Sequence, residues 1–160
     1  MELFLVLGTW ALVAVTLWVA YQQSRAFRKD LKIKLQLQFA DRFDNPQLVT
    51  ERASLAKHLL ETAPREQISE AVMDFFEDLG MFLDQGYLDE ALIWKTFGFY
   101  AVRWWSACRD YILEERRLHT DQTLFADFEA LAKRMRSRDI GAEISEPSSE
   151  NIRTFLMDES

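Results

Sequence analysis

An uncharged and mostly apolar run near the N-terminus constrains this chain more than any other feature. No charged residue occurs from Leu3 to Ser24, and the nineteen residues from Leu3 to Tyr21 are nearly all apolar. A helix of about twenty apolar residues crosses the hydrocarbon layer and satisfies its own backbone hydrogen bonds there. Residues 1–24 are therefore predicted to form a transmembrane anchor. A cleaved signal peptide would need a basic start and small residues at its cleavage site, and neither is present.

Basic residues cluster directly after this run and predict its orientation. The five are Arg25, Arg28, Lys29, Lys32 and Lys34, and no base precedes the run. Because such bases mark the cytoplasmic side of a span, we expect the N-terminus outside and the rest of the chain inside. The same bases would lie beside anionic head groups, each adding about 1 kcal/mol of attraction. Residues 25–45 are predicted to be a basic juxtamembrane helix, in which these bases set topology.

Small and hydroxyl residues recur on one face of the predicted span. Thr9, Val13, Thr16 and Ala20 are spaced four, three and four residues apart. Small side chains let transmembrane helices approach closely, so this face is a candidate for oligomerisation. Small residues are also common in any span, and that alternative stays open.

The remainder of the chain predicts an all-α domain over residues 46–140. Only three Pro and five Gly occur, which favours helices over a chain with many tight turns. Residues 31–39 alternate between apolar and polar like a strand, but no second strand exists to pair with them, so a helix is expected. The predicted fold class is a four-to-five-helix bundle behind one membrane span. An acidic, Ser-rich tail over 141–160 is expected to be largely disordered.

Apolar periodicity and breakers place the expected helices within that domain. Gly86 reads as a helix stop, Gly98 as a break or kink, and Thr120 or Asp121 as a helix start. The expected helices cover residues 47–61, 66–84, 89–97, 99–118 and from 120 or 121 to 138.

Charge and cysteine content exclude several function classes. The formal net charge is −7, which disfavours free nucleic acid as a partner. Cys108 is the single cysteine, so neither an internal disulfide nor a cysteine-based metal cluster can form. The sequence contains no metal-binding HExxH motif and no Gly-rich phosphate loop. We therefore expect no metal and no cofactor, and an enzyme is the less favoured class.

Carboxylates repeat at helical spacing in one segment. Glu66, Glu70, Asp74 and Asp78 follow one another at i+4 steps. Four carboxylates on one face could bind a hard cation. A solvated face, or one paired with arginine, is the favoured interpretation, and the candidate partners are Arg103, Arg109, Arg116, Arg117 and Arg134.

Arg52 and His58 form the weak catalytic candidate of the chain. Their separation is similar to that of the HEPN superfamily of small helical RNases, in which His acts in acid–base catalysis and Arg stabilises phosphate charge. The residue after Arg52 is Ala53, where that superfamily usually has a polar residue. A surface His58 and an Arg52 paired with an acid are favoured instead.

Aromatic residues concentrate between positions 94 and 105: Trp94, Phe97, Phe99, Tyr100, Trp104 and Trp105. They could stack nucleic-acid bases. Core packing is favoured, with one residue of the Trp104–Trp105 pair exposed at an interface.

The order of several short motifs resembles a bacterial family of unknown function. These motifs are Phe43-Asp44-Asn45-Pro46, Phe75 to Gly80, Gln85 to Asp89, Phe97-Gly98 and Trp104-Trp105. The resemblance covers residues 3–135 and implies a protein of the bacterial inner membrane, with one N-terminal span and a cytoplasmic helical domain. The plan is also similar, more loosely, to the HEPN-like pore-forming accessory protein of type VI CRISPR loci. That similarity implies a pore or a phage-defence role.

Three functions follow as hypotheses. The preferred one is a non-enzymatic membrane protein that self-assembles into a homo-oligomer. The second is a membrane-tethered HEPN-like RNase that uses Arg52 and His58. The third is a monomeric adaptor that recruits a cytoplasmic protein partner through its acidic face or tail.

Overall fold

The computed structural model describes residues 2–61, 68–138 and 147–160, and in the first helix it leaves the side chains of residues 2–9, 11, 14, 26 and 28 undescribed. Helices make up the regular structure of this part, and no strand occurs in it, so the predicted all-α class is confirmed. The six helices are α1 (Glu2–Phe43), α2 (Pro46–Glu61), α3 (Ala71–Asp84), α4 (Glu90–His119), α5 (Ala126–Ser137) and α6 (Ser149–Glu159).

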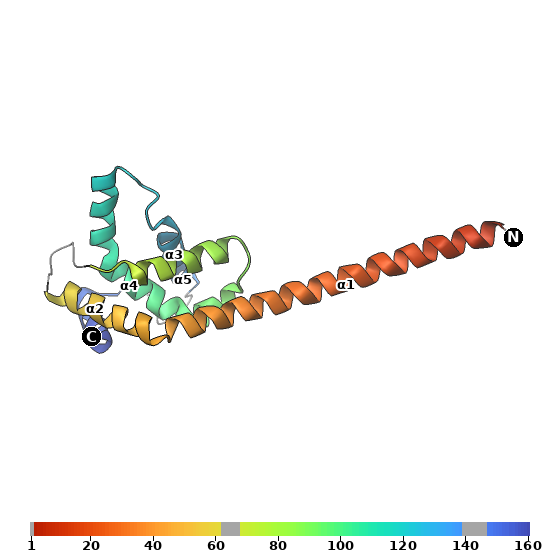
Figure 1. Ribbon diagram of the computed structural model, residues 1–160. Coiled ribbons are helices and arrows are strands. Elements are labelled where there is room, and N and C mark those ends of the chain that lie inside the picture. Colours follow the sequence, from red (N-terminus) through yellow and green to blue (C-terminus); the bar gives the residue numbers. More distant parts are fainter. Residues whose placement is uncertain (1, 62–67, 139–146) are drawn as a thin grey trace.

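Helix α1 is 42 residues long, and its N-terminal half projects away from the other helices (Figure 1). The alternating segment 31–39 is helical throughout, as predicted. Its C-terminal end belongs to the domain, because Phe39 and Phe43 are buried and make edge contacts with Phe75 or its neighbours. The domain therefore begins within α1, several residues before the predicted boundary at residue 46.

Among the residues that the structure describes, no helix is both long enough and apolar enough to cross a membrane. The predicted anchor includes residues 1–9, 11 and 14, which lie outside the described side chains. The anchor therefore stays a prediction.

Helices α3 and α5 pack closely, and a glycine makes this possible. A Cβ placed on Gly80 would lie 2.3 Å from the backbone oxygen of Asp127. Only a residue without a side chain fits at that crossing. The core around it is rich in aromatic rings, and Phe76 stacks on Phe128 with centroids 5.0 Å apart.

The turn after α3 follows the predicted stop at Gly86. Gly86 has φ +74°, the left-handed conformation that glycine adopts without strain. The N–H of Tyr87 donates to the carbonyl of Phe82, and the N–H of Gly86 donates to that of Leu83. The rings of Phe82 and Tyr87 lie 6.1 Å apart. This is a Schellman motif, and it fixes the position of Tyr87.

Helix α4 corrects two predicted boundaries. It continues through Gly98, where the sequence predicts a break. Gly98 is buried, and packing of the helix offsets the low helix propensity of glycine. Thr120 does not start the next helix; it ends α4 in a left-handed conformation with φ 53°. Asp121 then accepts hydrogen bonds from the backbone and hydroxyl of Thr123, which forms a turn, and α5 starts at Ala126.

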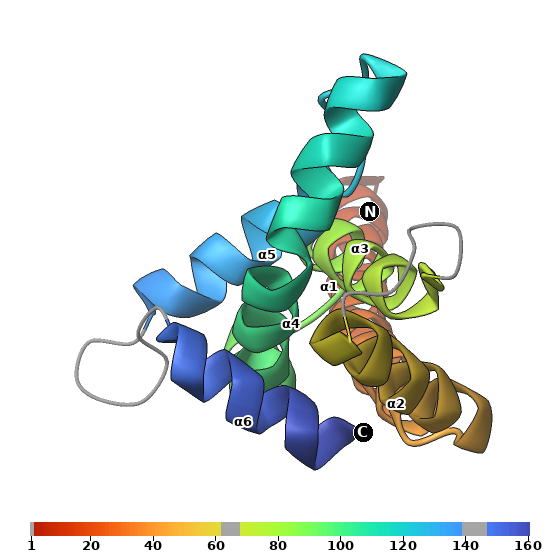
Figure 2. The same cartoon turned by 90° about the vertical axis from the view of Figure 1, so that its left-hand side faces the viewer.

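The predicted disorder of residues 141–160 is wrong for the last part of this segment. Residues 149–159 form α6, which begins at Ser148 as an N-cap and packs on α2 and α4 (Figure 2). Three of its apolar residues, Ile152, Phe155 and Leu156, occupy one face, and the latter two are buried, whereas Met157 is exposed. Disorder was predicted from the acidic composition of the whole segment. Docking of α6 depends instead on the apolar residues of one helix face, which an average composition does not reveal. Residues 139–146 lie outside the described part of the chain.

Candidate functional site

The projecting half of α1 carries large apolar side chains that the domain does not bury. Each such side chain described there is exposed: Trp10, Leu12, Val13, Val15, Leu17, Trp18, Val19 and Tyr21. At 100° per residue these positions cover every side of the helix rather than one stripe. Of the predicted oligomerisation face, Val13, Thr16 and Ala20 are exposed, the Thr16 hydroxyl donates to the carbonyl of Leu12, and Thr9 lies outside the described side chains.

The predicted basic residues follow on the same helix. Arg25, Lys29 and Lys34 are exposed, Lys32 is half-buried, and the side chain of Arg28 is not described. The guanidinium of Arg25 lies 5.5 Å from the ring centroid of Tyr21. These bases lie between the apolar half of α1 and the helical domain, as the sequence order requires.

Arg52 is buried at the junction of four helices. Its guanidinium carbon lies 4.0 Å from the ring centroid of Phe43 on α1 and 6.0 Å from that of Tyr100 on α4. Its Nε atom lies 3.6 Å from a carboxylate oxygen of Glu159 on α6. Burial raises the pKa of Glu159, and Arg52 opposes this shift. Arg52 therefore joins α2 to α1, α4 and α6.

His58 lies six residues after Arg52 on α2 and is half-buried. Its Nδ1 atom is buried and has no hydrogen-bond partner among the described atoms. A phosphate could reach Arg52 only after α6 and Glu159 had moved, since both cover its guanidinium. The contacts of Arg52 thus favour the structural interpretation of this pair over the RNase interpretation.

The carboxylate series on α3 has a different arginine partner from those expected. Arg42 of α1 donates to Asp78 at 2.6 Å, and the Tyr111 hydroxyl of α4 donates to Glu70 at 3.0 Å. Burial raises the pKa of Asp74, with Glu70 and Asp78 adding to the shift and Arg42 opposing it. Glu66 lies outside the described residues, and the described part of the chain holds no group of three His, Cys, Asp or Glu suited to a metal ion.

The aromatic cluster of α4 forms core in part, since Trp94 and Tyr100 are half-buried and Phe99 is exposed. Phe97, Trp104 and Trp105 are all buried, so the expectation that one tryptophan of the pair is exposed is wrong. Trp105 contacts Phe128 of α5, and Trp104 contacts Phe155 of α6. Helix α5 therefore covers one tryptophan of the pair and helix α6 covers the other. Cys108 is buried beside them, and burial raises the pKa of its thiol to about 12. A thiol with this pKa is protonated and is not a nucleophile near neutral pH.

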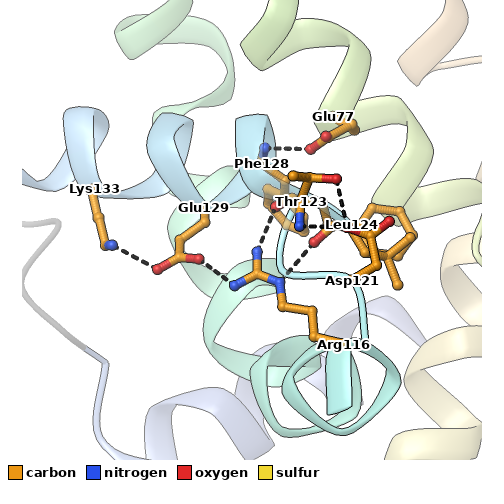
Figure 3. A network of polar contacts seen from close by, with 9 residues as sticks. Glu77, Arg116, Asp121, Thr123, Leu124, Phe128, Glu129 and Lys133 are labelled. Carbon is orange, nitrogen blue, oxygen red and sulfur yellow. Dashed lines mark hydrogen bonds and ion pairs between the residues drawn. The ribbon is translucent and has the colours of Figure 1, made fainter. Parts of the chain in front are cut away.

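Arg116 organises the connection between α4 and α5 (Figure 3). Its Nε donates to the carbonyl of Leu124 at 2.8 Å, and its Nη2 donates to that of Phe125 at 3.3 Å. Its Nη1 donates to Glu129 at 2.6 Å, and Glu129 also accepts from Lys133 at 2.6 Å. These two cations lower the pKa of Glu129. Because Arg116 is buried and its donors face carbonyls and a carboxylate of its own domain, its role is structural.

Glu77 supplies the N-terminal cap that α5 lacks. The residue before α5 is Phe125, whose side chain cannot accept a hydrogen bond. Glu77 of α3 accepts from the backbone N–H of Phe128 at 2.6 Å, as seen in Figure 3. Burial raises the pKa of Glu77, and the backbone donors of Phe128 and Asp127 oppose the shift. A carboxylate at a helix N-terminus is also favoured by the helix dipole.

Fold and surface together define a class of protein: an all-α domain carried at one end of a long helix whose other half exposes apolar side chains on all sides. A family model, Domain of unknown function (DUF4760), matches residues 9–135. The chain belongs to this family, which agrees with the resemblance to a family of unknown function. Comparisons with curated proteins and with solved structures find no match. The matched range ends at Met135, so α6 lies outside it.

Proposed function

We propose that this protein is a single-pass, membrane-anchored and non-enzymatic helical scaffold, with its domain on the cytoplasmic side. The observation that carries the proposal is the all-round exposure of apolar side chains on the projecting half of α1. Leu12, Leu17 and Trp18 are each more than 60 % exposed there. By contrast, the domain buries its own large apolar side chains around Phe75, Phe76 and Trp104.

The distribution of these side chains favours lipid over a protein partner as their surroundings. A partner helix covers one stripe of an amphipathic helix and leaves the opposite side to water. On α1 the opposite sides are apolar too, so a single partner would leave half of them exposed. Lipid surrounds a helix completely, and the uncharged run of residues 3–21 has the length that a bilayer needs.

Orientation follows from the bases after the run. Arg25, Lys29, Lys32 and Lys34 lie on the domain side of the apolar half. The positive-inside rule then places the domain in the cytoplasm.

Self-assembly of the spans is the second part of the proposal. It rests on the stripe of Thr9, Val13, Thr16 and Ala20. The Thr16 hydroxyl donates a hydrogen bond to the carbonyl of Leu12 in the same helix, so it needs no other acceptor. A small side chain of this kind suits a close helix–helix contact in lipid.

Extraction and topology experiments test the anchor. The full-length chain, expressed in bacteria, should stay in the membrane pellet through washing at pH 11, and protease added to the outside of intact cells should leave the domain uncut. Release of the chain by the wash would overturn the anchor. Mass photometry in a mild detergent tests assembly: particles larger than one chain are expected, and a monomer that persists across concentrations would overturn self-assembly.

A further inference from the structure

A basic hollow lies where α1 passes the turn between α3 and α4. Its volume is about 840 Å³. The turn lies at the end of the domain nearest the projecting half of α1 (Figure 1). The hollow is lined on one side by α1 and on the other by the turn, with Tyr21, Ser24, Arg25, Lys29, Leu31, Lys32, Gln85, Gly86 and Tyr87.

The bases of the hollow share one face of α1. Tyr21, Arg25, Lys29 and Lys32 are spaced four, four and three residues apart, which places them in one row along the helix. Lys34 follows two residues later, about 200° further round, and it does not line the hollow. Within the described part of the chain, no carboxylate forms an ion pair with Arg25, Lys29 or Lys32. Three positively charged side chains thus line this hollow, and none of them has an ion pair within the described part of the chain.

The geometry of a helix directs these side chains toward the apolar half of α1. Side chains on an α-helix lean toward its N-terminus, and long basic side chains extend further along the same direction. The apolar run ends at Tyr21, four residues before Arg25. The guanidinium of Arg25 lies 5.5 Å from the ring centroid of Tyr21, at the end of the apolar run, where a bilayer would place its phosphates.

The turn adds neutral groups that suit an anion. The Schellman motif holds Gly86 and Tyr87 at the wall opposite the bases, and Tyr87 is half-exposed there. Gly86 has no side chain to fill the hollow, and tyrosine and serine hydroxyls can donate hydrogen bonds to phosphate oxygens.

We propose that this hollow binds the phosphate of an anionic phospholipid head group on the cytoplasmic leaflet. The inference rests on the proposed membrane anchor and deepens it: one lipid is held between α1 and the domain. Such a lipid would fix the tilt of the domain relative to the membrane. Diffuse attraction of basic residues to an anionic surface is the competing explanation, and it treats Lys32 and Lys34 alike.

Short-chain lipids titrated into the detergent-solubilised full-length chain test the proposal. Dihexanoyl phosphatidylglycerol should bind more tightly than dihexanoyl phosphatidylcholine. Lys32→Gln should weaken the phosphatidylglycerol affinity about fivefold, and Lys29→Gln with Lys32→Gln about 25-fold. Lys34→Gln is the matched control, since it removes the same charge two residues away, and it should change the affinity less than twofold. Circular dichroism checks that each variant keeps its helix content.

Three outcomes would overturn the site. Equal losses from Lys32→Gln and Lys34→Gln would mean diffuse attraction. Displacement of the lipid by an equal concentration of inorganic phosphate would mean a site for free phosphate rather than for lipid. Equal affinity for both lipids would mean that the site does not distinguish an anionic head group from a zwitterionic one. Washing at pH 11 tests the anchor separately. If the chain stays in the membrane pellet but does not distinguish the two lipids, only the proposed lipid site is wrong. If the wash releases the chain, both the anchor and the lipid site are wrong.

Discussion

The two ends of the chain treat apolar side chains in opposite ways. The N-terminal half of α1 is the most apolar segment, yet its described side chains are all exposed. Helix α6 comes from an acidic segment, yet it buries Phe155 and Leu156 against the domain. The difference lies in arrangement: α6 places Ile152, Phe155 and Leu156 on one face, and α1 distributes its apolar residues on all sides. Burial within one chain therefore depends on a face that matches a partner, not on apolar content.

The apolar side chains at the two ends of the chain also have different surroundings. Phe155 contacts Phe99, Tyr100 and Trp104 within the domain, and such burial contributes about 1.5–3 kcal/mol per large side chain. No described element covers Trp10 or Leu17 in the same way. Charged substitutions at the first end and truncations at the second should therefore affect different measurements.

The largest effect is expected from charges in the apolar half of α1. Val13→Lys with Val15→Lys should oppose membrane insertion by about 5–7 kcal/mol, since each lysine near mid-span costs about 2.5–3.5 kcal/mol. The chain should leave the membrane pellet, while the melting temperature of the domain stays the same, because both side chains are exposed. Val13→Leu with Val15→Leu is the control and should remain in the pellet. Retention of the lysine variant in the pellet would contradict the anchor.

Phe155→Ala tests the other end. Removing a buried phenylalanine costs about 3–5 kcal/mol, but here the loss stops at the free energy with which α6 docks. Amide hydrogen exchange should become fast over residues 149–159 and stay slow in α3. Met157→Ala, at an exposed position on the same helix, should leave exchange unchanged. Slow exchange of α6 in the Phe155→Ala variant would show that other contacts dominate docking.

Gly80→Ala should destabilise the domain without changing the apolar half of α1 or the docking of α6. The added Cβ meets the backbone oxygen of Asp127, so α3 and α5 must move apart, at a cost of about 1–3 kcal/mol. A lowered midpoint of chemical unfolding is expected, with an unchanged fraction of chain in the membrane pellet. Gly86→Ala is a useful comparison, since a Cβ at Gly86 has nothing within 4 Å and acts only through its positive φ. An unchanged midpoint for Gly80→Ala would contradict the close crossing.

The smallest effect is the response of the domain to pH. Glu77 and Asp74 have raised pKa values, so the folded state binds their protons more tightly and stability rises as the pH falls from neutral. Glu129 and Glu90 have lowered pKa values, so their contribution is lost once the pH falls below the usual carboxylate range. Maximum stability is expected on the acidic side of neutral, with each contribution below about 1 kcal/mol because these groups are partly exposed.

Chemical unfolding measured across this pH range checks the expectation, and Glu77→Gln should flatten the rise on the acidic side of neutral. Residues 3–20 contain no ionisable side chain, so membrane retention should not follow the same profile. A stability that only falls from neutral downward would contradict the raised pKa values.

Local patterns in the sequence determined much of the fold. The periodicity of α2 and α3, the stop at Gly86 and the continuation of α1 through residues 31–39 were all predictable, because they depend on residues within one or two helical turns. The basic cluster after the apolar run was also identifiable from the order of residues, but which of its bases line one hollow was not. The break at Gly98 and the start at Thr120 were predicted wrongly, because burial and a left-handed turn overrode local preference there.

Only the tertiary structure decided which distant residues meet. Arg42 rather than a later arginine reaches Asp78, Glu159 reaches Arg52, and Glu77 caps a helix about fifty residues further along the chain. The hollow combines the basic face of α1 with a turn some sixty residues later, a pairing that no local pattern contains. The sequence alone specifies the apolar run and its basic flank, since both are properties of contiguous residues. Which surfaces surround them depends on how the helices pack, and packing is set by contacts between residues far apart in the chain.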